Sequence, residues 1–442
     1  MNIRLKKKGT PYGVEAHESK VTAGNPIAPA PLPEKVSISL HQNIGAPCEA
    51  VVKRGDKVLT GQKIGDSESF VNAPIHATIS GEITGTTTVI NPPTGQPVAA
   101  LVITSDGKDE WAEPGAPGKL EALSTKEILG RIRAAGLVGL GGAAFPSHVK
   151  LSPPKDKKID AVILNGCECE PYITSDHRVM LEYGEKILSG LNIIKKILSP
   201  DNIYIAIEDN KEDAIDHMEK LITTMGFKDD FKISPLTTKY PMGAEKVLTK
   251  LILGREVPIG GLPLDVGVVI HNVSTAKAIH DAVIEGKPFV ERVVTITGAV
   301  SNPKNLLVRF GTPLKSLIEY CGGIVGKANE VILGGPMMGF SQFDLDFPTL
   351  KGTNGMIVKK SIAVAEQDCI SCGKCIEVCP MHLMPTILAK LSKAGRYEEC
   401  RDYHITGCFE CGACAYVCPA NIPLVQYIKV AKKELAKRAF KK

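Results

Sequence analysis

Two short cysteine motifs toward the C-terminal end constrain this chain more than any other part of its sequence. They read CISCGKCIEVCP and CFECGACAYVCP, each spaced C-x2-C-x2-C-x3-C-P, and together they hold 8 of the 13 cysteines. Thiolates two residues apart on a tight turn can bind three corners of one iron–sulfur cubane, so the fourth ligand must come from elsewhere. The spacing therefore predicts a domain that holds two 4Fe–4S clusters.

The ligand sets of the two clusters follow from a general rule. In two-cluster ferredoxins the last cysteine of each run ligates the cluster of the other run. We therefore expect two mixed sets: Cys369, Cys372, Cys375 and Cys418 for one cluster, and Cys408, Cys411, Cys414 and Cys379 for the other. Zinc is the alternative, because paired C-x2-C also suits zinc. Two identical runs that each end in Cys-Pro favour iron–sulfur clusters.

The composition indicates a multidomain globular protein of a reducing compartment. The chain has 442 residues, 43% of them hydrophobic and 23% charged, which predicts three or four domains. Disulfide frameworks suit short secreted chains, so cofactor ligation is the better interpretation of the cysteines. A net charge of +5 does not argue for nucleic acid. Neither a long apolar run nor a secretory signal in MNIRLKKKG is present, so we expect no transmembrane helix and no export.

The N-terminal part of the chain has an all-β pattern. Short β-branched runs alternate with Gly turns over residues 36–106, which predicts a β domain within residues 1–115. The pieces VVKRGDKVLTGQKIG and PIHATISGEITG resemble halves of biotinyl- and lipoyl-type barrel-sandwich domains. The hairpin tip that would carry biotin or lipoate is missing, so we expect a docking or structural role.

The remaining segments predict a multidomain α/β plus α+β fold. Residues 116–288 alternate buried-strand runs (DAVILNG, NIYIAIED) with helical runs, which predicts a parallel sheet, and ITSDHRVMLEYGEKILSGLNIIKKIL is expected to form one helix. Residues 289–350 return to short strands and turns and predict a small α+β unit. Residues 341–360 have the composition of a linker, and the cysteine domain fills residues 351–442.

A Gly-rich loop, GLVGLGGAAFPSHVK, is the first candidate binding segment. Gly139, Gly141 and Gly142 can expose backbone donors and let a phosphate or a ring come close. Phe145 offers a stacking face, and Lys150 offers a positive charge. A plain turn is the alternative.

The second candidate segment is NGCECEPYITSDH, at the end of a predicted strand. Ligands of open α/β sheets bind at the carboxyl ends of strands, which draws attention to Asn165, Glu168 and Glu170. The alternative is that these acids cap the following helix. Two acids that flank Cys169 and precede Pro171 exceed what capping needs.

These segments resemble a known family. GLVGLGGAAFPSHVK looks like the GRGGAGFPTGxK loop of the NADH- and FMN-binding flavoprotein subunit of respiratory complex I, and NGCECEPYITSD is similar to its NADESEPGxxKD segment. KYPMGAEKVL and VVIHNVSTA match its YICGEETAL and VNNVET blocks. The four blocks follow one another in the same order.

The order of the whole chain is closer still to the C-subunit family of Rnf electron-transport complexes, which QNIGAPCEAVVKRGDKVLTGQKI, YPMGAEK and ILGGPMMG resemble. That family joins a barrel-sandwich hybrid domain, a Rossmann-like flavoprotein domain, a β-grasp domain of the SLBB type and a two-cluster ferredoxin domain. The resemblance assigns these to residues 1–115, 116–288, 289–350 and 351–442.

The resemblance implies binding roles in three groups, which are a phosphate loop, strand-end residues and a facing wall. Gly139, Gly141, Gly142 and Lys150 would line the flavin phosphate and the nucleotide, with Phe145 stacking on the nicotinamide-nucleotide side. Asn165 and Glu168 would face FMN, with Glu170 near the NADH ribose. The wall would be Tyr240, Gly243 and Glu245, with Asn272 and Thr275 helping to hold FMN.

The implied function is electron transfer between NAD(H), FMN and the two clusters, in an ion-translocating ferredoxin:NAD oxidoreductase. No catalytic acid or base is required of the protein. The implied partners are the other Rnf subunits, including membrane-embedded ones, with ferredoxin reached indirectly through the complex. The implied location is peripheral, at the cytoplasmic face of the membrane.

Four departures from the complex I pattern motivate an alternative. Leu140, Ala144, Cys167 and Ala244 stand where that family has arginine, glycine, aspartate and glutamate. The lost contacts predict weaker FMN retention, and a relay or scaffold subunit with an inactive nucleotide site is one alternative. A cobalamin-reductase-type iron–sulfur flavoprotein is another, although there the barrel-sandwich unit follows the clusters.

A few features remain outside these motifs. Three isolated cysteines are expected to be packing residues: Cys48, Cys321 and Cys400. Cys167 and Cys169 leave an extra metal site open, and His271 is expected to fill a structural position. The tail VAKKELAKRAFKK is expected to be a basic helix, either solvated or in contact with an anionic membrane or an acidic partner.

Overall fold

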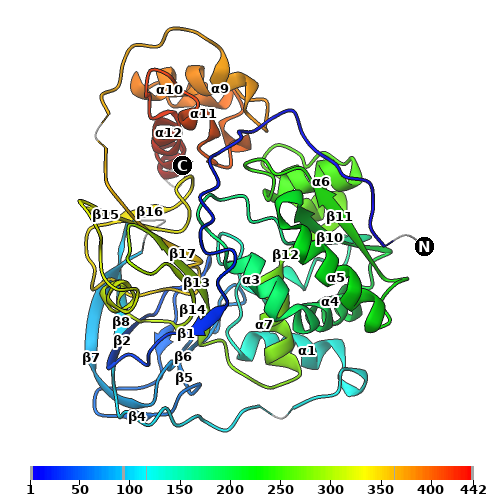
Figure 1. Cartoon of the computed structure of the whole chain (residues 1–442), viewed down its shortest axis with the longest axis vertical. Coiled ribbons are helices and arrows are strands. Elements are labelled where there is room, and N and C mark those ends of the chain that lie inside the picture. Colours follow the sequence, from blue (N-terminus) through cyan, green and yellow to red (C-terminus); the bar gives the residue numbers. More distant parts are fainter. Residues whose placement is uncertain (1–2, 92–94, 116, 363, 440–442) are drawn as a thin grey trace.

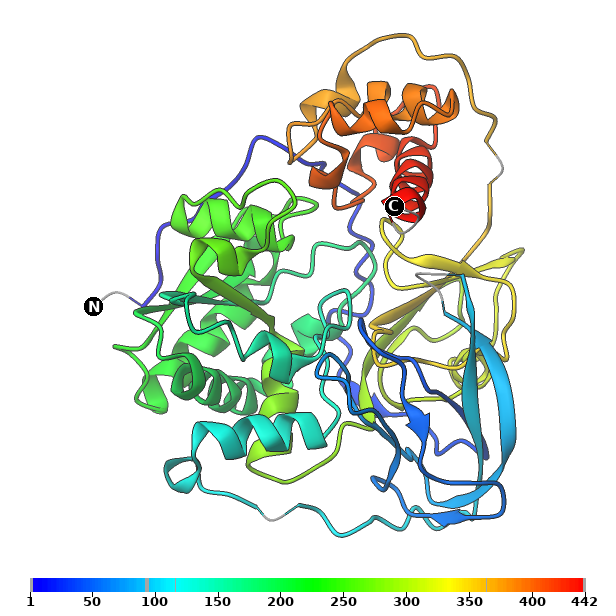
Figure 2. The same cartoon turned by 180° about the vertical axis from the view of Figure 1, so that it is seen from behind.

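The structure is a computed structural model that describes residues 3–91, 95–115, 117–362 and 364–439. Its long axis runs from a β-rich end to the cysteine domain, and an α/β domain lies alongside (Figure 1). The view from behind shows the same arrangement, with the cysteine domain at one end (Figure 2). Residue 116, where the second domain was expected to begin, lies outside the described residues, as do residues 440–442 of the tail.

The α/β domain is built on a parallel sheet in the order β11-β10-β9-β12. The strands are β9 (Ala161–Asn165), β10 (Asn202–Glu208), β11 (Phe231–Leu236) and β12 (Val268–Asn272). All residues of β9 and β12 are buried, as expected for strands covered by helices on both faces. From β9 the sheet grows through β10 and β11 on one side, and β12 is then added on the other side of β9. The carboxyl ends of β9 and β12 therefore form a topological switch point.

Helices cover both faces of this sheet (Figure 1). They are α1 (Thr125–Ala134), α3 (Ser175–Glu182), α4 (Gly184–Leu198), α5 (Glu212–Thr224), α6 (Glu245–Leu253) and α7 (Val273–Val283). The expectation of a single helix from ITSD to KKIL is wrong, because the helix is interrupted at Tyr183. Gly184, the first residue of α4, lies close to its neighbours at this interruption, since a Cβ there would be 2.4 Å from Leu221 Cδ1.

The expected all-β pattern after residue 35 is confirmed as two small sheets. One has the order β2-β8-β7-β4 and the other β3-β5-β6. The strands are β2 (Lys35–Ser39), β3 (Glu49–Ala50), β4 (Lys57–Val58), β5 (Lys63–Asp66), β6 (Ile75–His76), β7 (Gly81–Ile90) and β8 (Pro97–Ser105). Alternate aliphatic side chains of both sheets form one buried core, as in a barrel sandwich.

A six-stranded mixed sheet combines strands from segments that the sequence analysis assigned to different domains. Its order is β1-β14-β13-β17-β15-β16, with helix α8 (Leu314–Tyr320) beside it. The strands are β1 (Ile27–Pro29), β13 (Glu291–Gly298), β14 (Lys304–Arg309), β15 (Glu330–Leu333), β16 (Phe340–Gln342) and β17 (Gly355–Lys359).

This sheet corrects one expectation and extends another. Residues 341–360 are not simply a linker, because β17 lies between β13 and β15, and its first four residues are buried. The run GMIVK is apolar enough for a central strand, but the polar residues before it give the segment the composition of a linker. Strand β1 pairs with β14, so residues 27–29 of the N-terminal part also contribute a strand to this sheet.

The cysteine domain is helical and has two similar halves. A one-turn helix begins within each motif, α9 (Lys374–Glu377) and α11 (Ala413–Tyr416), and a longer helix follows each, α10 (Pro385–Lys393) and α12 (Leu424–Ala439). Helices α10 and α12 pack on a shared aliphatic core. Short 3-10 turns occur at Leu120–Ala122, Asp209–Lys211, Pro263–Val266, Glu398–Arg401 and Ile405–Gly407.

The first residues of the chain form an extended segment, drawn in dark blue in Figure 1, that passes the α/β domain and the cysteine domain before reaching β1. Arg4 and Lys8 make bridges to the edge strand β11, and Val14 makes a bridge to Tyr240. We call residues 3–25 the N-terminal strap. Among the described helices, none has the length and apolar character that crossing a membrane requires.

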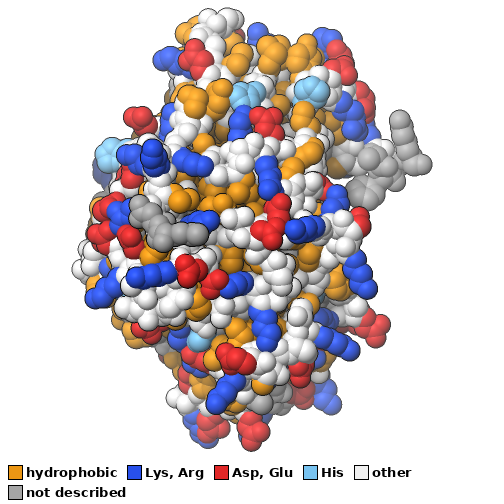
Figure 3. All heavy atoms as spheres, turned by 90° about the vertical axis from the view of Figure 1, so that its right-hand side faces the viewer, with side chains coloured by type: hydrophobic (Ala, Val, Ile, Leu, Met, Phe, Trp, Pro, Cys, Tyr) orange, Lys and Arg blue, Asp and Glu red, His pale blue; other side chains and the backbone are white. Residues whose placement is uncertain are grey.

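Charged side chains of both signs are interspersed on the face in Figure 3. On this face the described residues therefore show no extended surface of one sign.

Candidate functional site

Two asparagines lie side by side at the switch point of the parallel sheet. Asn165 ends β9 and Asn272 ends β12, and the two residues are paired in register. The Asn165 side chain accepts a hydrogen bond from Cys167 N–H (3.0 Å) and donates one to Gly243 O (2.9 Å). Asn272 Oδ1 accepts from Ser274 N–H (2.8 Å) and so caps α7. The asparagines thus fix the turns on which the neighbouring candidate residues lie.

The Gly-rich loop lies over these strand ends. It runs from α1 to the one-turn helix α2 (Ser147–Lys150). Leu140 N–H donates to Thr275 Oγ1 at 2.9 Å, which ties the loop to the first turn of α7. A Cβ at Gly141 would lie 3.0 Å from Asn272 Cβ, so the approach of the loop depends on glycine there. Gly141 and Gly142 are exposed, which leaves their backbone groups open to a ligand.

The two acids of the NGCECEPY segment are both bound to backbone donors. Glu168 is buried and accepts from Asp176 N–H (2.8 Å) and His177 N–H (3.2 Å), so it caps α3, as in the alternative interpretation from sequence. Glu170 accepts from Met337 N–H (3.1 Å) and Met338 N–H (2.9 Å) in the loop after β15. Burial raises the pKa of Glu170 to about 7, against the lowering effect of those two donors.

The facing wall connects the α/β domain to the cysteine domain. Tyr240 is buried, and its hydroxyl donates to the carbonyl oxygen of Cys411 at 2.6 Å. Gly243 lies close to the C-x-C turn, since a Cβ there would be 2.9 Å from Cys167 O. Glu245, at the start of α6, forms an ion pair of 2.6 Å with Lys150 of the Gly-rich loop. The structure therefore brings the loop and the wall together at this ion pair.

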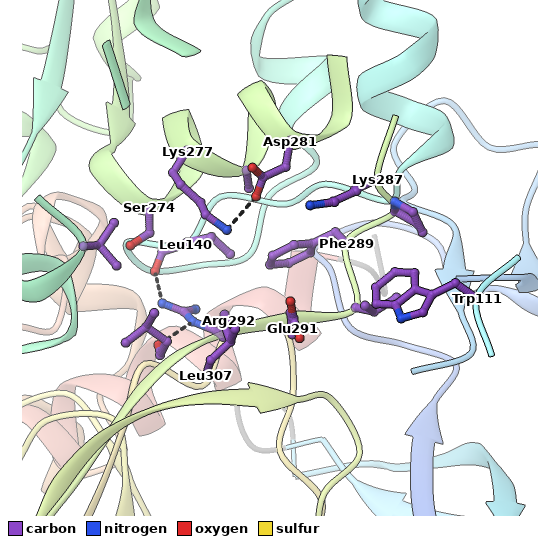
Figure 4. Close-up of a pocket in the computed structure, with 15 residues that line it drawn as sticks. Trp111, Leu140, Ser274, Lys277, Asp281, Lys287, Phe289, Glu291, Arg292 and Leu307 are labelled. Atoms are coloured by element: carbon purple, nitrogen blue, oxygen red, sulfur yellow. Dashed lines mark hydrogen bonds and ion pairs between the residues drawn. The ribbon is translucent and has the colours of Figure 1, made fainter. Parts of the chain in front are cut away.

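Two charged residues that the sequence analysis missed lie beneath the loop. Arg292 of β13 is buried and donates to Leu140 O at 3.3 Å (Figure 4). It also donates to Lys351 O at 2.8 Å. Burial lowers its pKa to about 10, although Asp176 and Glu168 act in the opposite direction. Asp176 accepts from Asn272 Nδ2 (2.6 Å), and burial raises its pKa to about 6. Asp176 follows the NGCECEPYITS run, but Arg292 comes from another domain and gives no local signal.

A cavity beside α7 is separate from the predicted binding residues. Leu140, Ser274, Lys277 and Trp111 are among the residues that line it (Figure 4). Lys277 forms an ion pair with Asp281 (2.6 Å). None of the residues that the sequence singled out for FMN or NADH lines this cavity.

The residues at the switch point fit a flavin nucleotide. Open glycine backbone and an approach that a Cβ would block suit a phosphate-bearing ligand. Buried polar atoms without a hydrogen-bond partner among the described residues include Ser147 Oγ and His148 Nδ1 in α2, which follows the loop, and His271 Nε2, next to Asn272 in β12. Buried polar groups are normally paired, so these atoms are consistent with a polar ligand. His271 is buried as expected, and burial lowers its pKa.

The cysteine domain brings Cys379 of the first motif to three cysteines of the second. Cys379, Cys408, Cys411 and Cys414 line one hollow. Burial and the neighbouring thiols raise the pKa of Cys411 to about 12. Backbone N–H groups point at the sulfurs, as in Leu383 N–H to Cys379 Sγ (3.4 Å) and Glu410 N–H to Cys408 Sγ (3.3 Å). Crowded thiols with backbone donors fit a cluster, whose iron would hold them as thiolates.

The other four cysteines form a more exposed group. Cys418 and Cys372 both act on Cys375, whose pKa is raised by burial first and by these two thiols in addition. Cys372 is exposed, and a backbone donor at Ser371 lowers the pKa of Cys369. Their arrangement fits the mixed ligand sets that the sequence rule predicts.

The remaining cysteines pack in cores. Cys48, Cys321 and Cys400 are buried among apolar side chains, as expected. Cys167 and Cys169 lie in the core below the wall, and burial raises the pKa of both thiols. The described residues bring no third His, Cys, Asp or Glu ligand atom close enough to form a three-ligand group with the pair.

Family models match four consecutive parts of the chain. They are an RnfC barrel sandwich hybrid domain (residues 9–108), a Nuo51 FMN-binding domain (132–281), an SLBB domain (293–341) and a 4Fe-4S dicluster domain (368–422). The order and the types agree with the architecture described above.

Curated relatives match nearly the full length. The chain is 50% identical to the C subunit of the proton-translocating ferredoxin:NAD(+) oxidoreductase complex of Clostridium ljungdahlii, over 96% of this chain and 93% of that one. It is 45% identical to the C subunit of the Na(+)-translocating complex of Acetobacterium woodii, over 95% of each chain. It is 41% identical to the C subunit of the ion-translocating oxidoreductase complex of Rhodobacter capsulatus, over 97% of this chain and 83% of that one.

A solved structure supports the fold alone. A chain of an NAD+-reducing [NiFe]-hydrogenase in the H2-reduced state superposes with a TM-score of 0.51 at 16% sequence identity, covering 72% of this chain and 61% of that one.

Proposed function

The chain belongs to the family of C subunits of ion-translocating ferredoxin:NAD(+) oxidoreductase complexes, and from this premise we propose that it exchanges electrons between NAD(H) and its partner subunits. Its cofactors are FMN and two 4Fe–4S clusters, and NAD(H) is the substrate. The observation that carries the proposal is the hydrogen bond from Tyr240 to Cys411, which joins the wall of the candidate flavin site to the loop of a candidate cluster ligand.

Bound FMN would supply the conversion between a hydride and single electrons, and the clusters would carry those electrons singly. The chain itself holds and orients. Gly141 and Gly142 would offer backbone donors to the flavin phosphate, because the N–H groups of Gly139 and Leu140 are already bound to Phe145 O (2.8 Å) and Thr275 Oγ1 (2.9 Å). Asn165 and Asn272 fix the turns at the strand ends. Phe145, half-buried beside the loop, offers its face to the nicotinamide nucleotide.

Lys150 and Glu245 have a different proposed role from a simple phosphate contact. Their side chains are 27% and 43% exposed, and their ion pair spans the loop and the wall. We assign them to the mouth of the site, where Lys150 becomes available to a phosphate when the pair opens. Glu170 is bound to the loop after β15, and we propose that it lies near the NADH ribose.

The two clusters differ in their distance from the wall. The Tyr240 hydroxyl binds the carbonyl oxygen of Cys411, so we call the cluster proposed for Cys379, Cys408, Cys411 and Cys414 the wall cluster. The one proposed for Cys369, Cys372, Cys375 and Cys418, the outer cluster, includes the exposed Cys372. This arrangement supports a path from the flavin to the wall cluster, then to the outer cluster and a partner.

The chain is one component of a multi-subunit complex, and we propose that membrane-embedded subunits accept these electrons and that ferredoxin is reached through them. We further propose a peripheral position at the cytoplasmic face. The domain boundaries are proposed with the corrections above, so that residues 27–29 and 355–359 go with the six-stranded sheet.

Anaerobic purification followed by NADH titration tests this function. We expect about eight irons and one FMN per chain, with flavin bleaching on addition of NADH. If FMN is lost during purification, added FMN should restore NADH oxidation by an artificial acceptor. A protein that retains flavin but is not bleached by NADH would instead be the relay subunit that the replacements at Leu140 and Ala244 suggest.

A further inference from the structure

We propose that the N-terminal strap positions the wall cluster against the flavin site, with Gly13 as the residue on which this contact depends. The inference rests on the proposed function and adds a positioning role for a segment outside both cofactor domains.

The strap is connected to both loops that supply the wall cluster, to the first directly and to the second through Tyr240. Gly13 N–H donates to Val378 O at 2.9 Å, and Val378 directly precedes Cys379. Val14 then exchanges two hydrogen bonds with Tyr240, from Val14 N–H to Tyr240 O (2.7 Å) and from Tyr240 N–H to Val14 O (2.9 Å). Because Tyr240 also holds Cys411 O, a single connected set of hydrogen bonds reaches ligands from both cysteine motifs.

The contact requires glycine at position 13. Gly13 has φ +86°, in the left-handed region that side chains disfavour. A Cβ there would lie 2.2 Å from Tyr240 O, a backbone atom that cannot rotate away. Any side chain at this position must therefore push the strap away from Tyr240 or from Val378.

Apolar packing reinforces the same point. Val14, Tyr240 and Ala413 are buried together in a small core, to which Met337 and Cys411 contribute. This core joins the strap, the α/β domain, the six-stranded sheet and the cysteine domain. The neighbouring Tyr12 ring adds an edge contact to His382, with centroids 4.3 Å apart.

The covalent connection of the cysteine domain is long and exposed by comparison. Residues 359–362 and 364–368 are exposed, and Figure 2 shows this connection arching away from the body of the protein. A long, exposed connection does not fix where the cysteine domain lies, so its position depends on its non-covalent contacts. The strap therefore contributes directly to the separation between the flavin site and the wall cluster.

The test uses Gly13→Ala, with Gly24→Ala as its matched control in the same strap. Gly24 has no atom within 4 Å of an added Cβ, so its replacement should change nothing. Each variant is prepared anaerobically with its cofactors and mixed with NADH. Flavin bleaching and cluster reduction are followed separately, and amide hydrogen exchange is measured over residues 10–18 and 238–244.

In Gly13→Ala we expect unchanged flavin bleaching, cluster reduction slowed by about tenfold or more, and faster exchange in both segments, because a small misplacement of reacting groups is costly. The EPR signal of the wall cluster should change, and that of the outer cluster should not. Wild-type cluster reduction in a Gly13→Ala protein that shows faster exchange would overturn the inference.

A second variant covers the case in which Gly13→Ala does not fold. Tyr240→Phe removes only the hydroxyl that binds Cys411 O, and we expect it to slow cluster reduction relative to flavin bleaching. An unchanged ratio of the two rates in Tyr240→Phe would also count against the inference. If wild-type protein itself fails to reduce its clusters with NADH, the proposed function fails, which is a different result from either variant behaving like wild type.

Discussion

The cysteine domain and the α/β domain bind their cofactors by opposite means. In the cysteine domain the ligands are side chains, and the backbone between them is short and repeats in two halves. In the α/β domain the candidate site is made mostly of backbone: exposed Gly141 and Gly142, two asparagines that fix turns, and acids such as Glu168 that are bound to N–H groups. The site in the cysteine domain depends on the cysteine side chains themselves. The candidate site in the α/β domain depends on how closely its backbone segments approach one another.

This difference predicts that the cysteine domain is most sensitive to removal of single side chains. Cys379→Ala should lose about four of the eight irons, and the loss should be of the wall cluster and not of the cluster bound by the rest of its own motif. Adding Cys411→Ala should cost no further iron, whereas adding Cys372→Ala should remove the remainder. Iron and sulfide analysis measures each case.

The matched control is Cys400→Ala in the same domain. Cys400 is buried in the core and is not a proposed ligand, so the iron content should stay at the wild-type level. Loss of all iron on changing Cys379 alone, with Cys400→Ala unaffected, would break the assignment of two separate clusters.

The α/β site should instead be most sensitive to an added side chain. Gly141→Val places new atoms against Asn272, where even a Cβ would be 3.0 Å from Asn272 Cβ. Overpacking of this kind costs about 1–3 kcal/mol, so we expect FMN to bind about tenfold or more weakly. Flavin fluorescence titration gives the affinity.

Gly130→Ala in α1 is the control, because nothing lies within 4 Å of its added Cβ. Equal FMN affinity in Gly141→Val and Gly130→Ala would mean that the loop does not cradle the flavin.

The burial of Glu170 should make stability depend on pH. Burial raises the pKa of Glu170 from 4.5 to about 7, so the folded state holds its proton more tightly than the unfolded state does. The stabilisation that the folded state gains from this proton is fully present below pH 4.5 and is lost as the pH rises to about 7. In that window the free energy of unfolding should fall by at most about 1.4 kcal/mol per pH unit.

Glu170→Gln should flatten this part of the profile. Thermal midpoints of wild type and variant between pH 5 and 8 provide the comparison. Parallel profiles would show that Glu170 titrates normally.

The ion pair at the mouth should have the smallest effect on stability. Lys150 and Glu245 are partly exposed, and such pairs contribute less than about 1 kcal/mol. A double-mutant cycle with Lys150→Met and Glu245→Gln should give a coupling energy below that value. A larger coupling energy would indicate that the mouth is held closed more firmly than its exposure suggests.

The same contrast explains what the sequence could and could not predict. The cysteine motifs are local, so ligand sets could be predicted from their spacing and the general rule for two-cluster ferredoxins. The structure places Cys379 beside the cysteines of the second motif. The Gly-rich loop and the strand ends were also recognisable, because each is a continuous segment at the end of a buried run.

Residues that act across domains were not recognisable in this way. Arg292 reaches Leu140 from a different sheet, and Val14 pairs with Tyr240 over more than two hundred positions of sequence. The short apolar run of β17 is isolated in a segment with linker composition, and its pairing with β13 and β15 makes it a strand. The pattern of one segment cannot encode a contact that depends on where another segment lies.

The account is tested most directly by a single turnover of the anaerobic protein with one equivalent of NADH, followed by flavin absorbance and by EPR of samples frozen at successive times. We predict that the flavin bleaches first and that the clusters then take up the two electrons one at a time, the wall cluster before the outer cluster. Bleached flavin beside clusters that stay oxidised, or clusters that NADH reduces in protein stripped of FMN, would contradict it.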